Sequence, residues 1–337
     1  MKEFHSSIFF TKVPLGGHYR YSDFFQIFPV DSEKMPYFKY QNHYPNILEY
    51  WTTDDDKIEM SIENEEFKEY TDLKSRTATT LLKQDKILNL LSAFTNNLFF
   101  RYYDHSGFWG IPRLKDNALE ESNESSSKWC VKIYNSPDMP RYLYIKDFSE
   151  QTSPEIKRIS NKEFYTKNPN LDYDSNIEIV LPSTIDVLFD TYYSLAPEIS
   201  KAIDTAALYA VSAIELKSNR KTLSLVASFL AMETMINLEY RDYKPEKCLE
   251  CGQLRFSIAR KFREYLLKYI GDTANNKKKF NDYYSLRSKI IHTGEHLKTE
   301  LLFNDLPRCV KEEEYLTRLE ILQMGKLAIT NWLLKNQ

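Results

Sequence analysis

The sequence predicts an α+β N-terminal domain followed by an all-α helical bundle. Short β-branched and aromatic runs occupy the first half of the chain, and helical patterns follow one another through the second half. The composition agrees, because 42% hydrophobic residues in a chain of 337 supply enough apolar surface for about two packed domains. We place the boundary near residue 183, which gives domains of residues 1–182 and 183–337.

The N-terminal domain combines strand and helix signals. Runs typical of strands cover residues 7–12, 21–30, 58–62, 129–134, 141–146 and 177–182. Residues 80–99 place their leucines and isoleucines at helical rather than alternating spacing, which predicts a helix. The role of this domain does not follow from its residues. One hypothesis is a sensing, regulatory or target-selecting part that binds a regulatory protein or a ligand.

Strand signals stop after Pro182. Helices are expected over residues 185–193, 197–217, 220–240, 254–270, 276–292 and 311–335. Ser194 is a typical N-cap and Pro197 a typical first-turn residue for the second of these helices. Gly294 is typical of the end of the fifth.

Charge is distributed unevenly along the chain. The total of 45 Lys+Arg and 48 Asp+Glu gives a net charge of −3, which by itself argues against nucleic acid. Residues 201–337, however, contain 23 basic and 17 acidic residues, whereas residues 1–200 contain 22 and 31. Between Arg255 and Lys289, ten basic residues face three acidic ones. This local excess attracts phosphate, although a solvated helix face explains the same charges.

Composition also excludes several classes of protein. The eight glycines form no P-loop and no G-x-G-x-x-G turn, which argues against nucleotide binding through a glycine-rich loop. No apolar run reaches the roughly 20 residues of a membrane span, and no signal peptide is evident at the start. Four cysteines in a chain of this length do not make a disulfide scaffold, so a reduced, cytoplasmic protein without membrane partners is expected.

The motif that points to chemistry is Arg287, four intervening residues and His292, within the segment DYYSLRSKIIHTG at residues 282–294. Here the chain resembles the HEPN superfamily, whose ribonucleases carry an Arg-x4–6-His motif at a helix end in a helical bundle. The Tyr…Arg-Ser-Lys-aliphatic-aliphatic-His helix end is most similar to the bacterial branch called Apea-like. Residues 230–236, which include Glu233, resemble the acid-bearing core helix of that family. The resemblance covers roughly residues 185–337.

The resemblance implies a metal-independent endoribonuclease, a hydrolase that needs no cofactor and acts as a homodimer with its active site at the dimer interface. Its partner is RNA, and its products carry 2′,3′-cyclic phosphate ends. Such domains are frequent in toxin–antitoxin and antiviral-defence systems. The alternative is a HEPN-like bundle without catalysis, which mediates dimerisation or binds RNA or a protein.

The physical chemistry of the two residue types fits this role. Histidine moves protons near neutral pH, and arginine offers a permanent, fork-shaped cation to a phosphate. Positions five apart on a helix point about 140° away from each other, so Arg287 and His292 are not expected to pair within one chain. They line one cleft if the helix ends near His292 or if two chains meet. The competing interpretation is a structural ion pair or a histidine that caps the helix C-terminus.

Other residues are candidates for supporting roles. Glu233 lies on an apolar stripe, where it either orients Arg287 or a tyrosine or makes a structural polar contact. Tyr283 and Tyr284 either stack on a base or pack in the core. Ser288 and a set of cations contact phosphate if RNA binds, and otherwise are solvated; the cations are Lys277, Lys278, Lys279, Lys289, Arg260 and Arg263.

Cys248 and Cys251 form half of a zinc ribbon. A structural zinc site needs four ligands, and the remaining Cys130 and Cys309 stand alone in the sequence. A reduced loop between two helices is therefore the main interpretation, and a zinc site is the minor one.

Overall fold

The computed structural model describes residues 2–30, 44–58, 68–101, 146–166, 178–243, 258–301 and 306–337. The chain divides into two compact units. The first contains residues 1–88, 99–159 and 171–182, and the second contains residues 89–98, 160–170 and 183–337. Among the described residues, none of the helices is both long and apolar enough to cross a bilayer.

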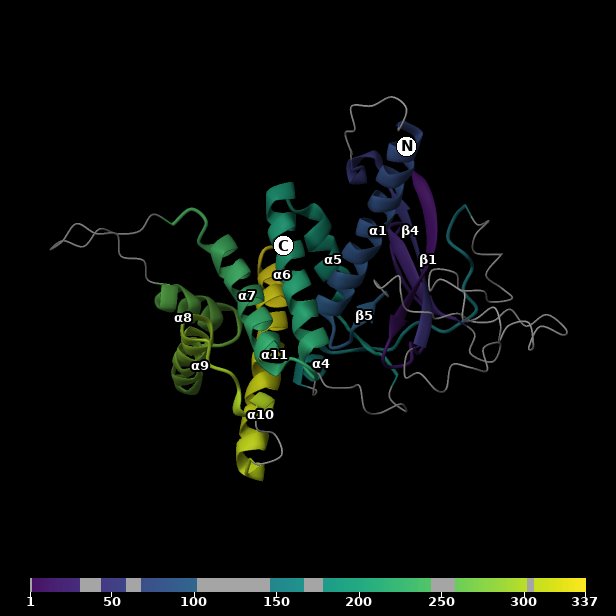
Figure 1. Cartoon of the computed structure of the whole chain (residues 1–337). Helices are drawn as coiled ribbons and strands as arrows, with labels where there is room; N and C mark the ends of the chain where they lie inside the picture. Colours follow the sequence, from purple (N-terminus) through teal and green to yellow (C-terminus); the bar gives the residue numbers. More distant parts are fainter. Residues whose placement is uncertain are drawn as a thin grey trace. The chain divides into compact units, whose positions relative to one another are not determined.

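The first unit is built on an antiparallel five-stranded sheet with the strand order β2-β3-β4-β1-β5 (Figure 1). Its strands are β1 (Glu3–Thr11), β2 (Tyr19–Tyr21), β3 (Phe25–Pro29), β4 (Tyr44–Thr52) and β5 (Phe99–Phe100). The longest pairing joins β1 to β4, with Glu3 opposite Thr52 and Thr11 opposite Tyr44. Phe9, Phe10 and other aromatic side chains of the sheet are fully buried, as strand residues of this type are expected to be.

Helix α1 (Lys68–Phe94) packs on this sheet through its residues in the first unit. The hydroxyl of Tyr50 on β4 donates to the carbonyl of Thr80 at 3.0 Å. The amide of Gln84 donates to the carbonyl of Ile8 on β1 at 3.2 Å. The helix begins twelve residues before the predicted residue 80, because its first turns are polar and carry no apolar periodicity.

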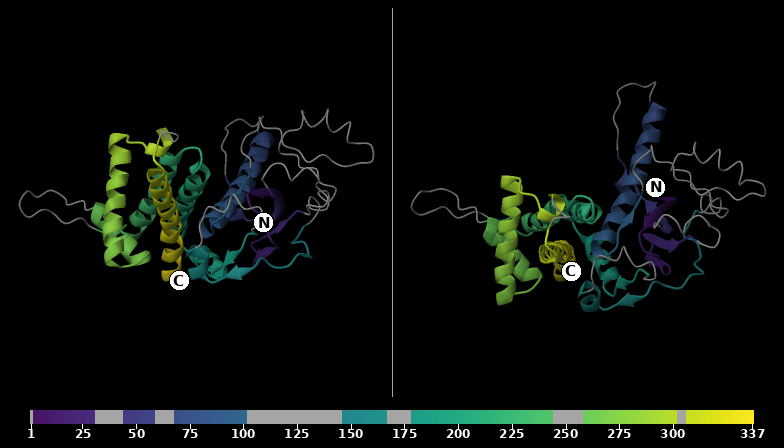
Figure 2. Two further views of the ribbon diagram at one scale, coloured as in Figure 1. Left: turned by 90° about the horizontal axis from the view of Figure 1, so that it is seen from below. Right: turned by 60° about the horizontal axis from the view of Figure 1, so that its bottom comes forward.

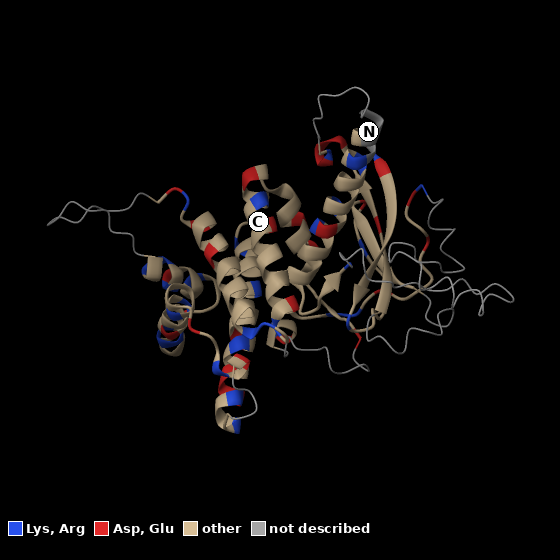
Figure 3. Cartoon of the chain, viewed as in Figure 1, with Lys and Arg blue, Asp and Glu red and all other residues tan. Residues whose placement is uncertain are grey.

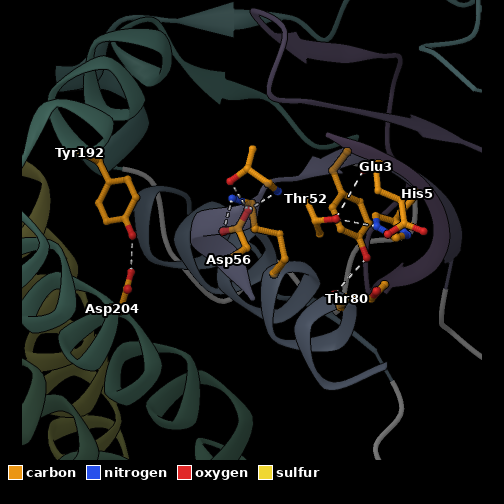
Figure 4. Close-up of polar contacts among 10 residues, drawn as sticks. Glu3, His5, Thr52, Asp56, Thr80, Tyr192 and Asp204 are labelled. Atoms are coloured by element: carbon orange, nitrogen blue, oxygen red, sulfur yellow. Dashed lines mark hydrogen bonds and ion pairs between the residues drawn. The ribbon is translucent and has the colours of Figure 1, made fainter. Parts of the chain in front are cut away.

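Glu49 on β4 is a buried carboxylate in the first unit. It accepts hydrogen bonds from the backbone N–H of Ser149 at 2.9 Å, from the Ser149 hydroxyl at 2.8 Å and from the Gln26 amide at 2.5 Å. These donors satisfy the acid without a cation, so Glu49 fastens the segment around residue 149 to the sheet. Between β1 and β4, His5 Nε2 lies 2.8 Å from the Thr52 hydroxyl (Figure 4), and burial lowers the pKa of His5.

Short pairings complete the first unit. Strand β6 (Arg158–Ile159) runs parallel to β7 (Leu181–Pro182), and an isolated bridge joins Leu15 to Ile179. The predicted strand at residues 177–182 is thus confined to its end. The predicted strand at residues 129–134 lies outside the described residues, as do residues 141–145 of the predicted strand 141–146 and residues 59–62 of the predicted strand 58–62.

The second unit is helical. Apart from the end of α1, its described helices are α4 (Asn161–Thr166), α5 (Ile185–Ser194), α6 (Pro197–Leu216), α7 (Lys221–Glu239), α8 (Ile258–Tyr269), α9 (Ala274–Thr293), α10 (Lys298–Leu301) and α11 (Arg308–Lys335). Pro197 opens α6 as predicted, but the N-cap is Ala196. Ser194 instead ends α5, where its hydroxyl donates to the carbonyl of Thr191.

Helix α11 is central to the packing of this unit, since it contacts α5, α6, α7 and α8 (Figures 1 and 2). Its last turns bury Ile329, Trp332 and Leu333. A short hydrogen bond of 2.5 Å from the Tyr192 hydroxyl to Asp204 joins α5 to α6 (Figure 4). The predicted fold class, an α+β part followed by a mainly helical part, is confirmed.

Candidate functional site

The site is built on α9, whose two ends are defined by the sequence. Thr273 is its N-cap and accepts a hydrogen bond from the Asn276 N–H at 3.1 Å. Gly294 ends the helix in the left-handed conformation with φ 69°, and its N–H donates to the carbonyl of Ile290. His292 therefore lies in the last turn of α9, as the glycine predicted, and its side chain is exposed.

Glu233 on α7 holds Arg287 on α9 by two hydrogen bonds. Arg287 Nε donates to Oε1 at 2.6 Å, and Nη2 donates to Oε2 at 3.0 Å. The two side chains are only 15% and 19% exposed. A bidentate, charge-assisted pair with this little solvent holds the guanidinium in one orientation. Of the partners considered for Glu233 from the sequence, the structure shows Arg287.

Arg287 also contacts His292 within the same chain. Its Nη1 lies 3.3 Å from His292 Nε2. The expectation that two positions 140° apart do not pair is therefore wrong. That expectation followed the direction in which each side chain leaves the helix, whereas the long arginine side chain bends back along the surface to reach the last turn.

The contact limits how the imidazole can take part in it. Arginine has only donors, so Nε2 accepts from Nη1 only in the tautomer that carries its proton on Nδ1. The three residues thus form a chain of contacts from carboxylate to guanidinium to imidazole.

The two tyrosines before Arg287 lie in different surroundings. Tyr283 is buried, and its hydroxyl donates to Glu320 on α11 at 2.7 Å. Burial and the neighbouring Glu320 carboxylate raise the pKa of Tyr283. Tyr284 is half-buried, and its ring packs against Phe262 of α8 with centroids 5.6 Å apart. Tyr283 is thus a packing residue, while Tyr284 keeps part of its surface in solvent.

Helices α8 and α9 carry an excess of positive charge (Figure 3). Several of the predicted phosphate contacts have protein partners: Lys277 pairs with Asp272, Lys279 with Glu320, Arg260 with Glu264, and Arg263 donates to Asn281. Lys278 and Lys289 are exposed and have no ion pair with a described carboxylate. Ser288 is half-buried, one position after Arg287.

The segment after Gly294 is fastened by backbone contacts that sequence spacing does not reveal. Glu300 Oε2 accepts from the N–H of Thr222 at 2.7 Å and so caps the start of α7. Although burial acts to raise it, the hydrogen bonds from Thr222 lower the pKa of Glu300. Glu314 accepts from the N–H groups of Lys298 and Thr299, both at 2.9 Å. These contacts hold the chain directly behind His292.

The structure does not describe the two cysteines that the sequence offers as metal ligands. Cys248 and Cys251 lie outside the described residues. Among the residues that are described, no three His, Cys, Asp or Glu side chains are grouped so that they could hold a metal ion. Cys309 at the start of α11 is a free, exposed thiol.

The fold and the site together define a helical unit with an exposed histidine beside an oriented arginine, attached to an α+β unit. Comparisons with protein-family models, with curated proteins and with solved structures found no match to this chain.

Proposed function

We propose that the chain is a metal-independent endoribonuclease of the HEPN type, which acts as a homodimer through Arg287 and His292. The observation that carries the proposal is the contact chain from Glu233 through Arg287 to Nε2 of the exposed His292. When RNA is cleaved through attack by its own 2′-hydroxyl, the reaction requires two groups side by side: a base and a fixed cation.

In the proposed reaction, His292 Nε2 takes the proton of a ribose 2′-hydroxyl. The O2′ oxygen attacks the adjacent phosphorus, a new O2′–P bond forms, and the P–O5′ bond breaks. The products are a 2′,3′-cyclic phosphate and a 5′-hydroxyl, and no oxidant or cofactor enters the balance. In a homodimer, the protonated imidazole of the second copy supplies the proton that the leaving O5′ needs.

Arg287 stabilises the charge that develops on the phosphate. Glu233 occupies Nε and Nη2, and one N–H of Nη1 is directed at the histidine. A guanidinium carries five N–H groups, so two others remain for phosphate oxygens once these contacts are made. Because Glu233 fixes the fork before substrate arrives, little reorganisation is needed in the transition state.

The proposal is tested by RNA cleavage with purified wild type, Arg287→Ala and His292→Ala in EDTA. We expect the wild type to cut and each variant to lose at least 100-fold in rate, because each substitution removes one of the two acting groups. Intact RNA with the wild type, or equal cleavage by both variants, contradicts the proposal.

One observation favours the alternative of a binding module without catalysis. The Glu233–Arg287 pair is largely shielded from solvent, and it also has the geometry of a structural ion pair that joins α7 to α9. In that case RNA binding survives both alanine substitutions, falls steeply with salt and is not followed by cleavage.

The resemblance further suggests a toxin or antiviral-defence setting. In this proposal the acidic N-terminal part senses a trigger, restrains the nuclease or selects its target, through a regulatory protein or a ligand. The opposite charges of residues 1–200 and 201–337 motivate this division of roles.

A further inference from the structure

Two tyrosines and two cations form a cluster where α7 ends and α8 begins. Tyr240 is the C-cap of α7, and a turn brings Tyr243 back toward it, with ring centroids 6.3 Å apart and planes at 88°. Lys261 Nζ lies 4.0 Å from the Tyr243 ring centroid and 5.3 Å from that of Tyr240. Arg260 donates to the Tyr243 hydroxyl at 3.0 Å.

This cluster is partly accessible to solvent, whereas Tyr265 close by is not. Tyr240 and Tyr243 are half-buried, and the Arg260 side chain is 45% exposed. By contrast, Tyr265 on the same helix as the cations is fully buried, and its hydroxyl donates to a backbone carbonyl. Core packing therefore explains Tyr265 but leaves Tyr240 and Tyr243 without a comparable reason for their position.

The charges of the cluster remain available to an anion. Arg260 pairs with Glu264 at 3.6 Å, but both side chains are nearly half exposed, so water and salt weaken this pair. Lys261 contacts aromatic rings and, among the described residues, has no carboxylate within ion-pair distance. A cation beside aromatic rings is the combination that binds a base together with its phosphate.

The cluster lies along the same face of α7 as Glu233, the partner of Arg287. Tyr240 follows Glu233 by seven positions, which is two turns along one face of α7 and a rise of about 10 Å. A nucleotide strand advances at least about 3.4 Å per nucleotide, so this distance corresponds to at most about three nucleotides.

Tyr284 joins α9 to α8 beside the cations of the cluster. It precedes Arg287 by one helical turn, and its ring packs on the buried Phe262, the residue next to Lys261. Arg287 and the cations of the cluster thus lie on the two helices that carry the excess of positive charge.

We propose that Tyr240, Tyr243, Arg260 and Lys261 form a subsite for an unpaired base and its phosphate, a few nucleotides from the cleaved bond. The inference rests on the proposed nuclease function and names its substrate class, single-stranded RNA or the loops of folded RNA. Duplex RNA does not fit this subsite, because its bases are stacked on each other and do not reach aromatic side chains.

The test measures binding of a fluorescent 2′-O-methyl RNA octamer, which lacks the attacking 2′-hydroxyl and stays uncut. We expect Tyr243→Ala to weaken octamer binding about tenfold or more, since stacking on an aromatic ring is lost. Tyr243→Phe keeps the ring and stays within about threefold of the wild type. Binding of a 16-base-pair RNA duplex is the same for all three proteins.

Tyr315→Ala is the matched control, because Tyr315 is an exposed tyrosine of α11 with its own cation–π contact to Arg318. It leaves octamer binding unchanged. Equal octamer binding by Tyr243→Ala and wild type, or equal losses on octamer and duplex, overturns the subsite. If Tyr243→Phe binds the octamer as weakly as Tyr243→Ala, the stacking subsite is likewise overturned.

Cleavage of an unmodified octamer separates the two proposals. If the wild type binds in a Tyr243-dependent manner but never cuts, the nuclease proposal fails and the subsite stands. If the wild type cuts and Tyr243→Ala binds and cuts equally well, the subsite fails and the nuclease proposal stands.

Discussion

At Arg287, one guanidinium makes three contacts with two side chains from two different helices. Nε and Nη2 donate to Glu233 on α7, and Nη1 faces His292 one turn further along α9. The position of the cation relative to the base thus depends on the carboxylate. In the proposed reaction Glu233 is a positioning residue, since it acts on the phosphate only through Arg287.

We therefore expect Glu233→Gln to reduce cleavage about 10- to 100-fold, because a neutral amide accepts only one guanidinium N–H and lets the fork rotate. The loss should lie in kcat more than in KM, and Glu233→Asp should recover part of it. Steady-state kinetics on a labelled RNA measures both.

Glu320→Gln is the control for this prediction, since Glu320 also contacts α9, through Lys279 and Tyr283, but not Arg287. Comparable losses in Glu233→Gln and Glu320→Gln would show that the effect comes from the stability of α9 and not from the orientation of Arg287.

Residue-level prediction from the sequence had a clear limit. The Arg-x4-His spacing made Arg287 and His292 candidates, and the apolar stripe made Glu233 a candidate partner; their catalytic roles stay a prediction. The contact between Arg287 and His292 was not predicted, because backbone geometry gives the direction of a side chain but not its reach. Tyr243 and Lys261 meet only through the tertiary packing of α7 and α8, which no local spacing records.

At the level of helices, Glu239 at the end of α7 joins three elements. It accepts hydrogen bonds from Lys268 and Tyr269 of α8, at 2.5 and 2.9 Å, and from the Trp332 indole of α11 at 2.9 Å. Although burial acts to raise it, these donors lower the pKa of Glu239. The same contact raises the pKa of Lys268 to about 12.

A carboxyl with a lowered pKa stabilises the folded state fully above its ordinary value near 4.5, and this contribution is lost as pH falls through the lower, folded value. Glu239→Gln should therefore lower the Tm by a few degrees at pH 7 and by much less near pH 3. Thermal unfolding followed by circular dichroism at both pH values measures this. A Tm difference that is the same at both pH values contradicts the assignment.

The helices of the second unit were predictable because their apolar periodicity and end signals agree. Residues 185–193, 197–217 and 220–240 were expected, and α5, α6 and α7 match them within a few residues. Strand β4 was not predicted. It is buried on both faces and includes Asn46 and Glu49, so it shows neither alternation nor a purely apolar run. The Asn46 amide N–H donates to the Thr11 hydroxyl, and Glu49 accepts from the Ser149 N–H, so partners of these polar residues are distant in sequence.

At the scale of the whole molecule, the two units are not consecutive segments. Residues 89–98 and 160–170 belong to the helical unit, and α1 passes from one unit into the other at residue 89. A boundary near residue 183, placed from composition, leaves these two segments out of the helical unit. The unit to which they belong depends on how they pack and not on their residue types.

The homodimer is a proposal with its own structural test. Leu223 on α7 is 51% exposed, and it lies on the same helical arc as the half-buried Val226 and Leu230 and as Glu233. We expect the wild type to sediment as a dimer at micromolar concentration. Leu223→Glu should give a monomer that cleaves RNA poorly, because a carboxylate in an apolar interface loses its water.

Leu316→Glu on α11 is the control, since Leu316 is 62% exposed and should tolerate the charge without a change of mass or activity. If the wild type is monomeric at these concentrations and still cleaves RNA, the homodimer proposal is contradicted.

The most direct test of the central claim is the chemistry of the RNA ends after cleavage by the wild type in EDTA. Attack by the 2′-hydroxyl, with His292 as base and Arg287 as cation, predicts 2′,3′-cyclic phosphate and 5′-hydroxyl ends, with no such products from His292→Ala. RNA that stays intact, or ends that carry 3′-hydroxyl and 5′-phosphate groups, would contradict the account.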